Sequence, residues 1–316
     1  MIIRFKTLNL IWVCIISSLL GYFISHRPRY LTDDYDAYEI MFENFEISSE
    51  LTFNLIRLVL RSFDLDFIYL LFIYGFFSIF FKSLNLYKYG FLNCFIFFLF
   101  YFISFFPLWE MTQIRIGLAM SLFIYSITLS DFHNTKKNLF LIISILFHYS
   151  MIFVIFPYFL YFFLKKDIFK FSIVSVFSAI LINLIFSYTN YSLYDVNLYS
   201  AHFSIFSPKI IFLVFLMIVC LKVIKSNFSL LSFSLSFFLL VSAVALGGKF
   251  PVVSIRLSDL SLFVLMFSVI FSVNNFNNFL LKIFLVLIVC CYYVYSYYLS
   301  YDNLVNLTVL KEWLFK

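Results

Sequence analysis

Residues 139–164, LFLIISILFHYSMIFVIFPYFLYFFL, form one long apolar run with the polar triplet His148-Tyr149-Ser150 near its middle. A membrane-spanning helix needs about 20 mainly apolar residues, because it must cross a hydrocarbon core about 30 Å thick. The run is therefore long enough for one tilted helix or for two short helices that meet near His148. The orientation of every later helix depends on which of these two it forms.

The composition of the whole chain is that of a membrane protein. Hydrophobic residues make up 64% of the 316 residues, charged residues only 12%, and the mean hydropathy is +1.02. Its apolar runs are continuous and lack the alternation of an outer-membrane barrel, so they predict helices. We expect an all-α, polytopic transmembrane helical bundle, with residues 1–316 as a single integral membrane domain. Besides 139–164, the predicted spans are 8–24, 67–84, 90–107, 114–130, 168–187, 210–224, 228–246, 257–273 and 279–299.

The basic residues indicate how the run 139–164 crosses the membrane. Lys and Arg in short loops accumulate on the cytoplasmic side. With the N-terminus inside, a single crossing would place these basic residues outside: Lys165, Lys166, Lys170, Lys222, Lys225 and Lys282. A short re-entrant-like hairpin keeps them inside and predicts about eleven membrane segments, with outer loops at about 25–66 and 188–208. Its turn at His148 would line a water-filled cavity, where irregular backbone is tolerated.

Charge and cysteine usage exclude other classes of protein. The net charge of +6 comes from basic residues in short loops between apolar runs, so we expect no nucleic-acid partner. The five cysteines lie in apolar runs, without a CxxC pair or a histidine at metal-ligand spacing. We therefore expect no metal site.

Arg115 is the first candidate for chemistry. It lies in the stretch Trp109–Ala119, WEMTQIRIGLA, at the predicted outer start of an apolar helix. An arginine at the membrane boundary is costly and is a functional candidate. It could be a snorkelling anchor paired with Glu110. Alternatively, its guanidinium group could bind phosphate. Arg binds phosphate better than Lys does, because its planar fork can donate two hydrogen bonds at once.

Two further candidates lie on the same predicted outer face. His148, at the turn of the hairpin, could act as a general base or donate to a phosphate. Arg256 begins a later predicted helix and could bind an anion, or it could pair with Asp259 three residues further on. Lys249 precedes Arg256 on this face. The hairpin topology thus gathers the unusual polar residues on one side.

The first outer loop is acidic between Asp33 and Glu50. An amphipathic helix that lies on the membrane surface is one interpretation of this stretch. The other is a set of carboxylates at the mouth of a cavity, suited to metal binding or to general-base catalysis. Further on, Arg57 and Arg61 share a helix face and would suit an anionic lipid headgroup.

Several of these residues together resemble the motifs of a known family. Asp34 and Tyr38, then Glu50, then Gln113–Ala119, then Phe147–Ser150 and finally Ile255-Arg256 follow one another between about 33 and 260. In this order they resemble the EpsG-like, Wzy-type polymerases of O-antigen and capsular polysaccharide. The arginine helix, followed by the His-Ser turn, is the most specific part of the resemblance.

The resemblance implies a function and a location. Members of this family work at the outer, periplasmic face of the bacterial inner membrane. They transfer a growing glycan from undecaprenyl diphosphate to a sugar hydroxyl of a lipid-linked repeat unit, and fixed cations make a cofactor unnecessary. The implied partners are the lipid-linked oligosaccharides, the bilayer and a chain-length regulator protein.

The resemblance also assigns roles to candidate residues. Arg115 and Arg256 correspond to arginines expected to bind the diphosphate, and we add the basic residues of the same face, Lys249 and Arg57. The candidate catalytic residues are His148, Asp34 and Glu50.

Two other functions remain open. A flippase for the same lipid-linked units would show basic residues deep in the membrane and internal repeats, which the sequence does not display. An O-antigen ligase would have a much larger outer loop than 188–208.

Overall fold

The computed structural model describes residues 2–32, 34–44, 50–84, 86–129, 134–186, 203–223, 227–271, 276–299 and 305–315. Every regular element in these residues is a helix. By length and composition, five of the helices can cross a membrane, and a bent pair would make a sixth. Four shorter apolar helices accompany them. The chain is therefore an all-α, multi-pass membrane protein, as its composition predicts.

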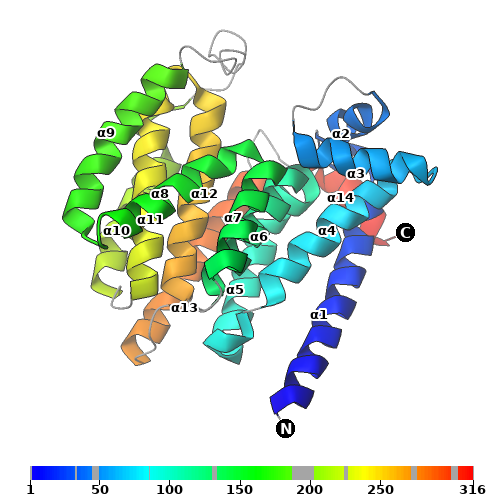
Figure 1. Ribbon diagram of the computed structural model, residues 1–316, viewed down its shortest axis with the longest axis horizontal. Coiled ribbons are helices and arrows are strands. Elements are labelled where there is room, and N and C mark those ends of the chain that lie inside the picture. The colour runs from blue at the N-terminus through cyan, green and yellow to red at the C-terminus, as the bar shows by residue number, and fades with distance from the viewer. Residues whose placement is uncertain are drawn as a thin grey trace. The chain divides into compact units, whose positions relative to one another are not determined.

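The helices belong to two compact units. The first comprises Met1–Ile152 and Leu287–Lys316, and the second comprises Phe153–Val286. The larger elements of the first unit are α1 (Ile2–Ser25), α2 (Asp34–Glu43), α3 (Leu51–Ser62), α4 (Phe67–Leu84), α5 (Phe91–Ser104), η3 (Phe106–Thr112), α6 (Ile114–Thr128), α7 (Asn134–Phe147), η7 (Tyr295–Leu299) and α14 (Leu307–Phe315) (Figure 1). Its short 3-10 turns are η1 (Arg29–Leu31), η2 (Leu86–Tyr89) and η5 (Tyr149–Met151).

The second unit is built mainly from long apolar helices. They are α8 (Ile152–Phe163), α9 (Ile168–Phe186), α10 (Pro208–Val223), α11 (Asn227–Leu246) and α12 (Pro251–Ile270), followed by α13 (Phe276–Val294), which ends in the first unit. Within the unit, α11 packs against α9 and α12, and α10 packs against α12. Asp259 of α12 pairs with Lys209 Nζ of α10 at 2.5 Å. The sequence had suggested Arg256 as the partner of this carboxylate.

The predicted spans coincide with helices, and the predicted break near His148 is present. Helix α7 ends at Phe147, His148 has extended backbone (φ −158°, ψ 115°), and η5 leads into α8. Because the boundary between the two units falls at Ile152, the reversal of the chain stays a prediction. Residues 187–202, most of the predicted outer loop 188–208, lie outside the described residues.

Helix α4 is the centre of the first unit, where it packs against α1 and α6. Two glycines allow its close contact with α1. A Cβ atom at Gly75 would lie 2.9 Å from Ile24 Cδ1, and one at Gly21 would lie 3.1 Å from the backbone nitrogen of Phe76. Small residues at a helix crossing let two backbones approach in this way.

The acidic helix α2 packs on protein through its apolar face. Its Tyr38 and Phe42 are buried in one core cluster with Phe53 of α3 and Phe67 of α4. The apolar face therefore contacts α3 and α4, rather than the membrane surface as one interpretation of the sequence had it.

The predicted span 90–107 is bent in the structure. Helix α5 ends at Ser104, and the chain turns by 63° into the π-helix η3. Pro107 lies in the first turn of η3, where its missing N–H leaves no hydrogen bond unmade. All seven residues of η3 are buried. This bend places Glu110 against α4 and α6.

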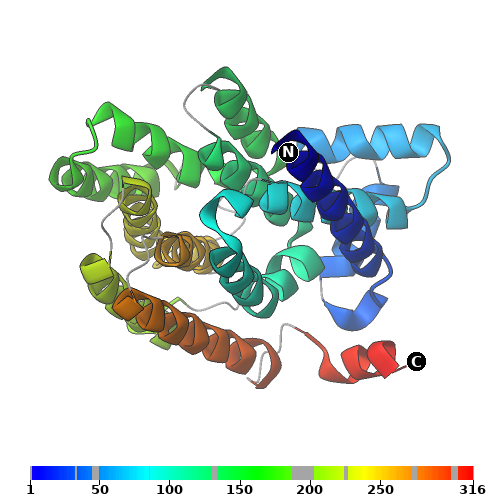
Figure 2. The ribbon, with the colours of Figure 1, turned by 90° about the horizontal axis from the view of Figure 1, so that it is seen from below.

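The last helix lies against the beginning of the chain. The backbone nitrogen of Asn306 donates to Leu31 O at 3.2 Å, and the rings of Phe23 and Trp313 are 4.3 Å apart. Seen from below, α14 (red) runs beside the blue first part of the chain (Figure 2).

Candidate active site

Glu50 joins the two most specific residues of the sequence motif. Its Oε2 lies 3.0 Å from Arg115 Nη1, and its Oε1 lies 2.6 Å from His148 Nδ1. The three residues come from distant parts of the chain. One carboxylate thus holds a cation and an imidazole side by side.

Local structure brings these residues together. Glu50 immediately precedes α3, Arg115 is the second residue of α6, and His148 immediately follows α7. Thr52 Oγ1 donates to Leu146 O at 2.8 Å, which fixes the start of α3 against the end of α7. The site therefore depends on helix ends that hold one another.

The three side chains are accessible to different degrees. Glu50 is 6% exposed, whereas Arg115 and His148 are 18% and 16% exposed. The carboxylate is enclosed by protein, whereas its two partners are partly exposed. Such an arrangement leaves the guanidinium and the imidazole able to meet a ligand.

Aromatic rings complete the wall behind Arg115. Its Cζ lies 5.2 Å from the ring centroid of Tyr38 and 5.8 Å from that of Phe53. A guanidinium over an aromatic face gains a cation–π attraction. Burial raises the pKa of Tyr38, although the charge of Arg115 opposes this, so the phenol is neutral at physiological pH.

This geometry can support acid–base chemistry next to an anion site. A carboxylate that accepts from Nδ1 fixes the ring and its tautomer, so that Nε2 becomes the proton acceptor. The Arg115 guanidinium carries further N–H donors that suit phosphate oxygens. The arrangement therefore combines a general base with a phosphate-binding group.

The pairing of Arg115 with Glu110, one of the two interpretations of the sequence, is wrong. Glu110 Oε1 accepts instead from Lys82 Nζ at 2.9 Å, from Ser78 Oγ at 2.7 Å and from the hydroxyl of Tyr101. The pairing fails because the bend at η3 turns Glu110 toward α4, while Arg115 begins a new helix.

Lys82, near the end of the predicted span 67–84, is buried in the unit instead of lying in a loop. Lys82 and its partner Glu110 are 0% and 1% exposed, and Lys82 Nζ also donates to Gly117 O at 2.9 Å. Lys282 is fully buried as well. These two lysines give no information on the side of the membrane, so the hairpin prediction depends on the other basic residues.

The remaining candidates lie elsewhere. Arg57 is buried and donates to Met41 O at 2.7 Å and to Asn44 O at 2.6 Å, the carbonyls at the end of α2. These bonds hold the backbone, and its role as a diphosphate ligand stays a prediction. Lys249 and Arg256 lie in the second unit. Their convergence on Arg115 also stays a prediction.

The structure reveals one candidate that the sequence analysis did not single out. Arg27, between α1 and η1, is only 3% exposed, and its Nη1 donates to Ile24 O at 3.2 Å. Burial lowers its pKa to about 10, a shift opposed by Tyr35, Tyr38, Asp34 and Glu110. Asp34, a predicted catalytic residue, thus acts electrostatically on Arg27. In the sequence, Arg27 looks like one of several basic residues flanking the first span.

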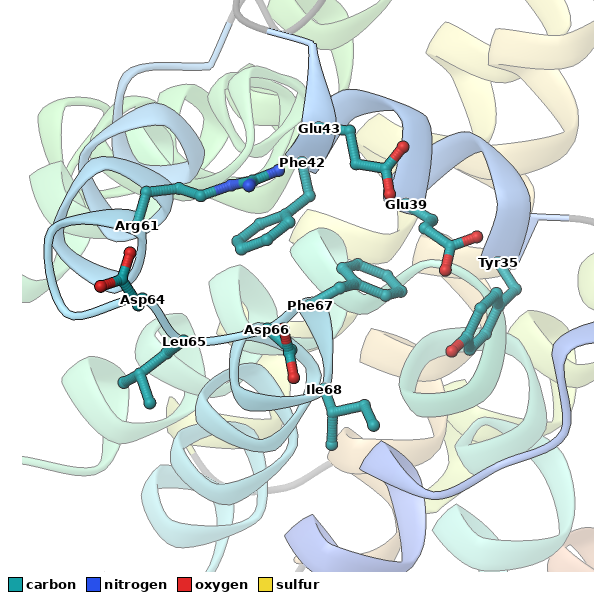
Figure 3. Close-up of a pocket in the computed structure, with 10 residues that line it drawn as sticks. All are labelled: Tyr35, Glu39, Phe42, Glu43, Arg61, Asp64, Leu65, Asp66, Phe67 and Ile68. Carbon is teal, nitrogen blue, oxygen red and sulfur yellow. The ribbon is translucent and has the colours of Figure 1, made fainter.

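A separate cavity of about 400 Å³ lies between α2 and the turn that joins α3 to α4. In Figure 3 the rings of Phe42 and Phe67 lie at its centre, between the carboxylates of Glu39 and Glu43 and the segment around Asp64. The full lining is Tyr35, Glu39, Phe42, Glu43, Arg61, Asp64, Leu65, Asp66, Phe67 and Ile68. No member of the Arg115, Glu50 and His148 cluster lines this cavity.

Comparison with known proteins agrees with the motif. The family model described as "EpsG family" matches residues 10–310. Searches of curated proteins and of solved structures found no match. The family match covers nearly all of the chain, including the candidate residues in each unit. The chain therefore belongs to the EpsG family.

Proposed function

We propose that this protein is a glycosyltransferase that polymerises O-antigen or capsular polysaccharide at the periplasmic face of the bacterial inner membrane. Its donor is a growing glycan on undecaprenyl diphosphate, and its acceptor is a sugar hydroxyl of a lipid-linked repeat unit. Membership of the EpsG family supports a polysaccharide polymerase in general terms. The observation that carries the more specific proposal is the bridge of Glu50 to Arg115 and His148.

The base in this reaction is His148. The acceptor hydroxyl gives its proton to Nε2 while its oxygen bonds to the anomeric carbon of the donor sugar. Glu50 holds the ring through Nδ1 and stabilises the imidazolium that forms. Arg115 Nη1 holds the other oxygen of the same carboxylate at 3.0 Å, which fixes the position of Glu50 for this task.

The leaving group is the lipid diphosphate. The bond between the anomeric carbon and the phosphate oxygen breaks, and its electron pair moves to the diphosphate. Fixed cationic donors at that oxygen lower the barrier, because they stabilise charge that develops in the transition state. Arg115 supplies such a donor. Its guanidinium lies over the rings of Tyr38 and Phe53, and it is within hydrogen-bond distance of Glu50, the carboxylate that holds His148.

A neighbouring sugar of the acceptor repeat unit, other than the one whose hydroxyl meets His148, has a suitable place in the cavity beside α2. Its wall carries the carboxylates Glu43, Asp64 and Asp66, which can accept hydrogen bonds from sugar hydroxyls. Phe42 and Phe67 offer ring edges and faces at the centre (Figure 3). Because four carboxylates face a single arginine there, this cavity favours neutral or amino sugars over acidic ones.

A flippase for the same lipid-linked units is the second candidate function. The fully buried Lys82 and Lys282 are the kind of deep basic residue that a transporter of anions would use. However, Lys82 Nζ donates to Glu110 and to Gly117 O, so its charge is used within the protein and not for binding an anionic substrate. The polymerase remains the better supported function.

Deletion of the gene separates the candidate functions. In a strain that makes lipopolysaccharide, loss of a polymerase leaves single repeat units on lipid A in a gel of surface polysaccharide. Loss of a flippase leaves none, and loss of a ligase leaves polymer on its carrier. We expect the single-unit pattern, and either other pattern would refute the proposal.

Variants then test the diphosphate contact. Arg115→Ala and Arg256→Ala should both give single units at normal protein levels, because each removes a proposed phosphate donor. Lys170→Ala, at an exposed ion pair in the first turn of α9, is the control and should give full-length chains. Long chains in both arginine variants would contradict the assigned roles.

A further inference from the structure

Two tyrosines of α2 each carry an arginine on their ring. Tyr35 and Tyr38 are three residues apart and therefore neighbours on one helix face. Arg27 Cζ lies 5.3 Å from the ring centroid of Tyr35, and Arg115 Cζ lies 5.2 Å from that of Tyr38. Arg27 follows the end of α1, and Arg115 lies in the first turn of α6. Helix α2 thus carries one guanidinium group on each of two neighbouring rings.

Both arginines have buried nitrogens without an acceptor. Within the described residues, Nε and Nη2 of Arg27 and Nε of Arg115 are buried and make no hydrogen bond. Buried N–H groups are almost always paired, and those of a charged group are the costliest to leave unpaired. These three nitrogens therefore mark a place where a hydrogen-bond acceptor is missing.

The charges of the two side chains define that acceptor. Although burial lowers the pKa of Arg27 to about 10, its guanidinium is still charged at neutral pH. Tyr35 has a raised pKa, also mainly through burial, so the ring beneath Arg27 is neutral. Two neighbouring cations with unused N–H donors suit an anion that has two charged groups, each with several oxygen atoms. A diphosphate has this form, and each guanidinium fork can bind one of its phosphates.

We propose that Arg27 and Arg115 form a two-arginine clamp for a diphosphate, mounted on Tyr35 and Tyr38 of α2. The inference rests on the proposed polymerase function, which requires a diphosphate leaving group. It assigns to Arg27 a phosphate contact that the sequence motif does not include. Asp34 and Glu50 lie beside the clamp, where they balance its charge while no ligand is bound.

Arg29 provides a matched control for Arg27. It lies two residues further on, but it is exposed and pairs with Asp36 at 2.6 Å and with Glu39 at 2.8 Å. Removing Arg29 deletes the same charge from the same segment without touching the clamp. A loss of binding specific to Arg27 therefore cannot be an effect of net charge.

The experiment measures binding to purified protein in nanodiscs with two probes, undecaprenyl diphosphate and inorganic pyrophosphate. We expect Arg27→Ala to weaken both probes by about 10- to 100-fold and Arg29→Ala to leave both within about twofold. Arg27→Lys keeps the charge and the packing of the stem but loses the fork. It should weaken both probes by about tenfold, and it tests the clamp even if the alanine variant does not fold.

The outcomes separate the clamp from the function on which it rests. Wild-type binding of neither probe would overturn the proposed polymerase function. Normal binding of both probes by Arg27→Lys would overturn the clamp while the function stands. A loss confined to undecaprenyl diphosphate would also overturn the clamp, because it would show that Arg27 contacts the lipid chain.

Discussion

Two buried carboxylates of the first unit, Glu50 and Glu110, each hold a cation, and these cations differ in exposure. Glu50 binds Arg115 and His148, both partly exposed, whereas Glu110 binds Lys82 in a fully enclosed network with Ser78. The chemistry of the two pairs is similar. Their access to a ligand is not.

The difference shows that burial determines whether a charged pair in a membrane protein has a structural or a catalytic role. An enclosed ion pair can only hold its own helices, and breaking one side leaves a costly charge behind. The Lys82 network does this by fixing the bent segment η3 against α4 and α6. A half-open pair, such as Arg115 with Glu50, can exchange partners when a substrate arrives. We therefore expect changes at Glu110 to affect stability and changes at Glu50 to affect catalysis.

The largest expected effect is on activity at the half-open site. His148→Ala should lower polymerisation of lipid-linked repeat units by about 100- to 10,000-fold, because the reaction loses its general base. The thermal unfolding midpoint should stay close to that of the wild type. His26→Ala, at an exposed histidine that stacks on Tyr22, is the control and should polymerise normally. Wild-type chain growth by His148→Ala would assign the base elsewhere.

The next effect is on stability at the enclosed pair. Lys82→Met should cost about 3–5 kcal/mol of unfolding free energy, because it leaves the Glu110 carboxylate buried without its cation. Adding Glu110→Gln should restore much of that loss. Denaturant unfolding in detergent measures both, with a substitution of the exposed Lys88 in η2, Lys88→Met, as control. Equal stability of Lys82→Met and the wild type would show that the pair does not hold η3.

A smaller effect is expected from crowding the enclosed network. A Cβ atom at Gly117 would lie 3.1 Å from both Glu110 Oε1 and Trp109 O. Gly117→Ala should therefore cost about 1–3 kcal/mol through overpacking. Gly248→Ala, where no atom lies within 4 Å of the added Cβ, should be nearly neutral in the same unfolding experiment. Similar stabilities of the two variants would mean that η3 can move away from α6.

The smallest effect is expected at a solvent-facing pair. Arg29 and Asp36 are about half exposed, so their ion pair contributes little to the free energy of unfolding. Asp36→Asn should shift the unfolding midpoint only slightly. A loss as large as that of Lys82→Met would contradict the view that burial sets the energetic role of these pairs.

The sequence predicts the helices of this protein well because hydropathy is a local property. The span 67–84 is α4 without a difference at either end, and the break at His148 lies where the polar triplet interrupts the apolar run. The motif also named Glu50, Arg115 and His148, which the structure places in contact. Their mutual arrangement through one carboxylate was not predicted.

The sequence does not reveal which charged side chains pair with one another in the folded protein. Glu110 is five residues from Arg115 and looks like its partner, but the bend at η3 directs it to Lys82, 28 residues earlier. Lys82 is six residues from Lys88 and looks like a loop residue, yet its side chain points into the unit. Arg27 carries no local signal at all, because its surroundings come from α1 and α2. In each case contacts between distant helices determine the role of the residue, and its position in the sequence suggests a different role.

The contact of α14 with the start of the chain has a consequence for biosynthesis. Residues Met1–Ile152 leave the ribosome first, but their unit also includes Leu287–Lys316. The hydrogen bond from Asn306 to Leu31 and the contact of Trp313 with Phe23 form only after the intervening helices have been inserted. The part of the protein that is made first is therefore the part that is completed last. A nascent chain released before residue 305 would leave the segment that carries Arg27 without its final support.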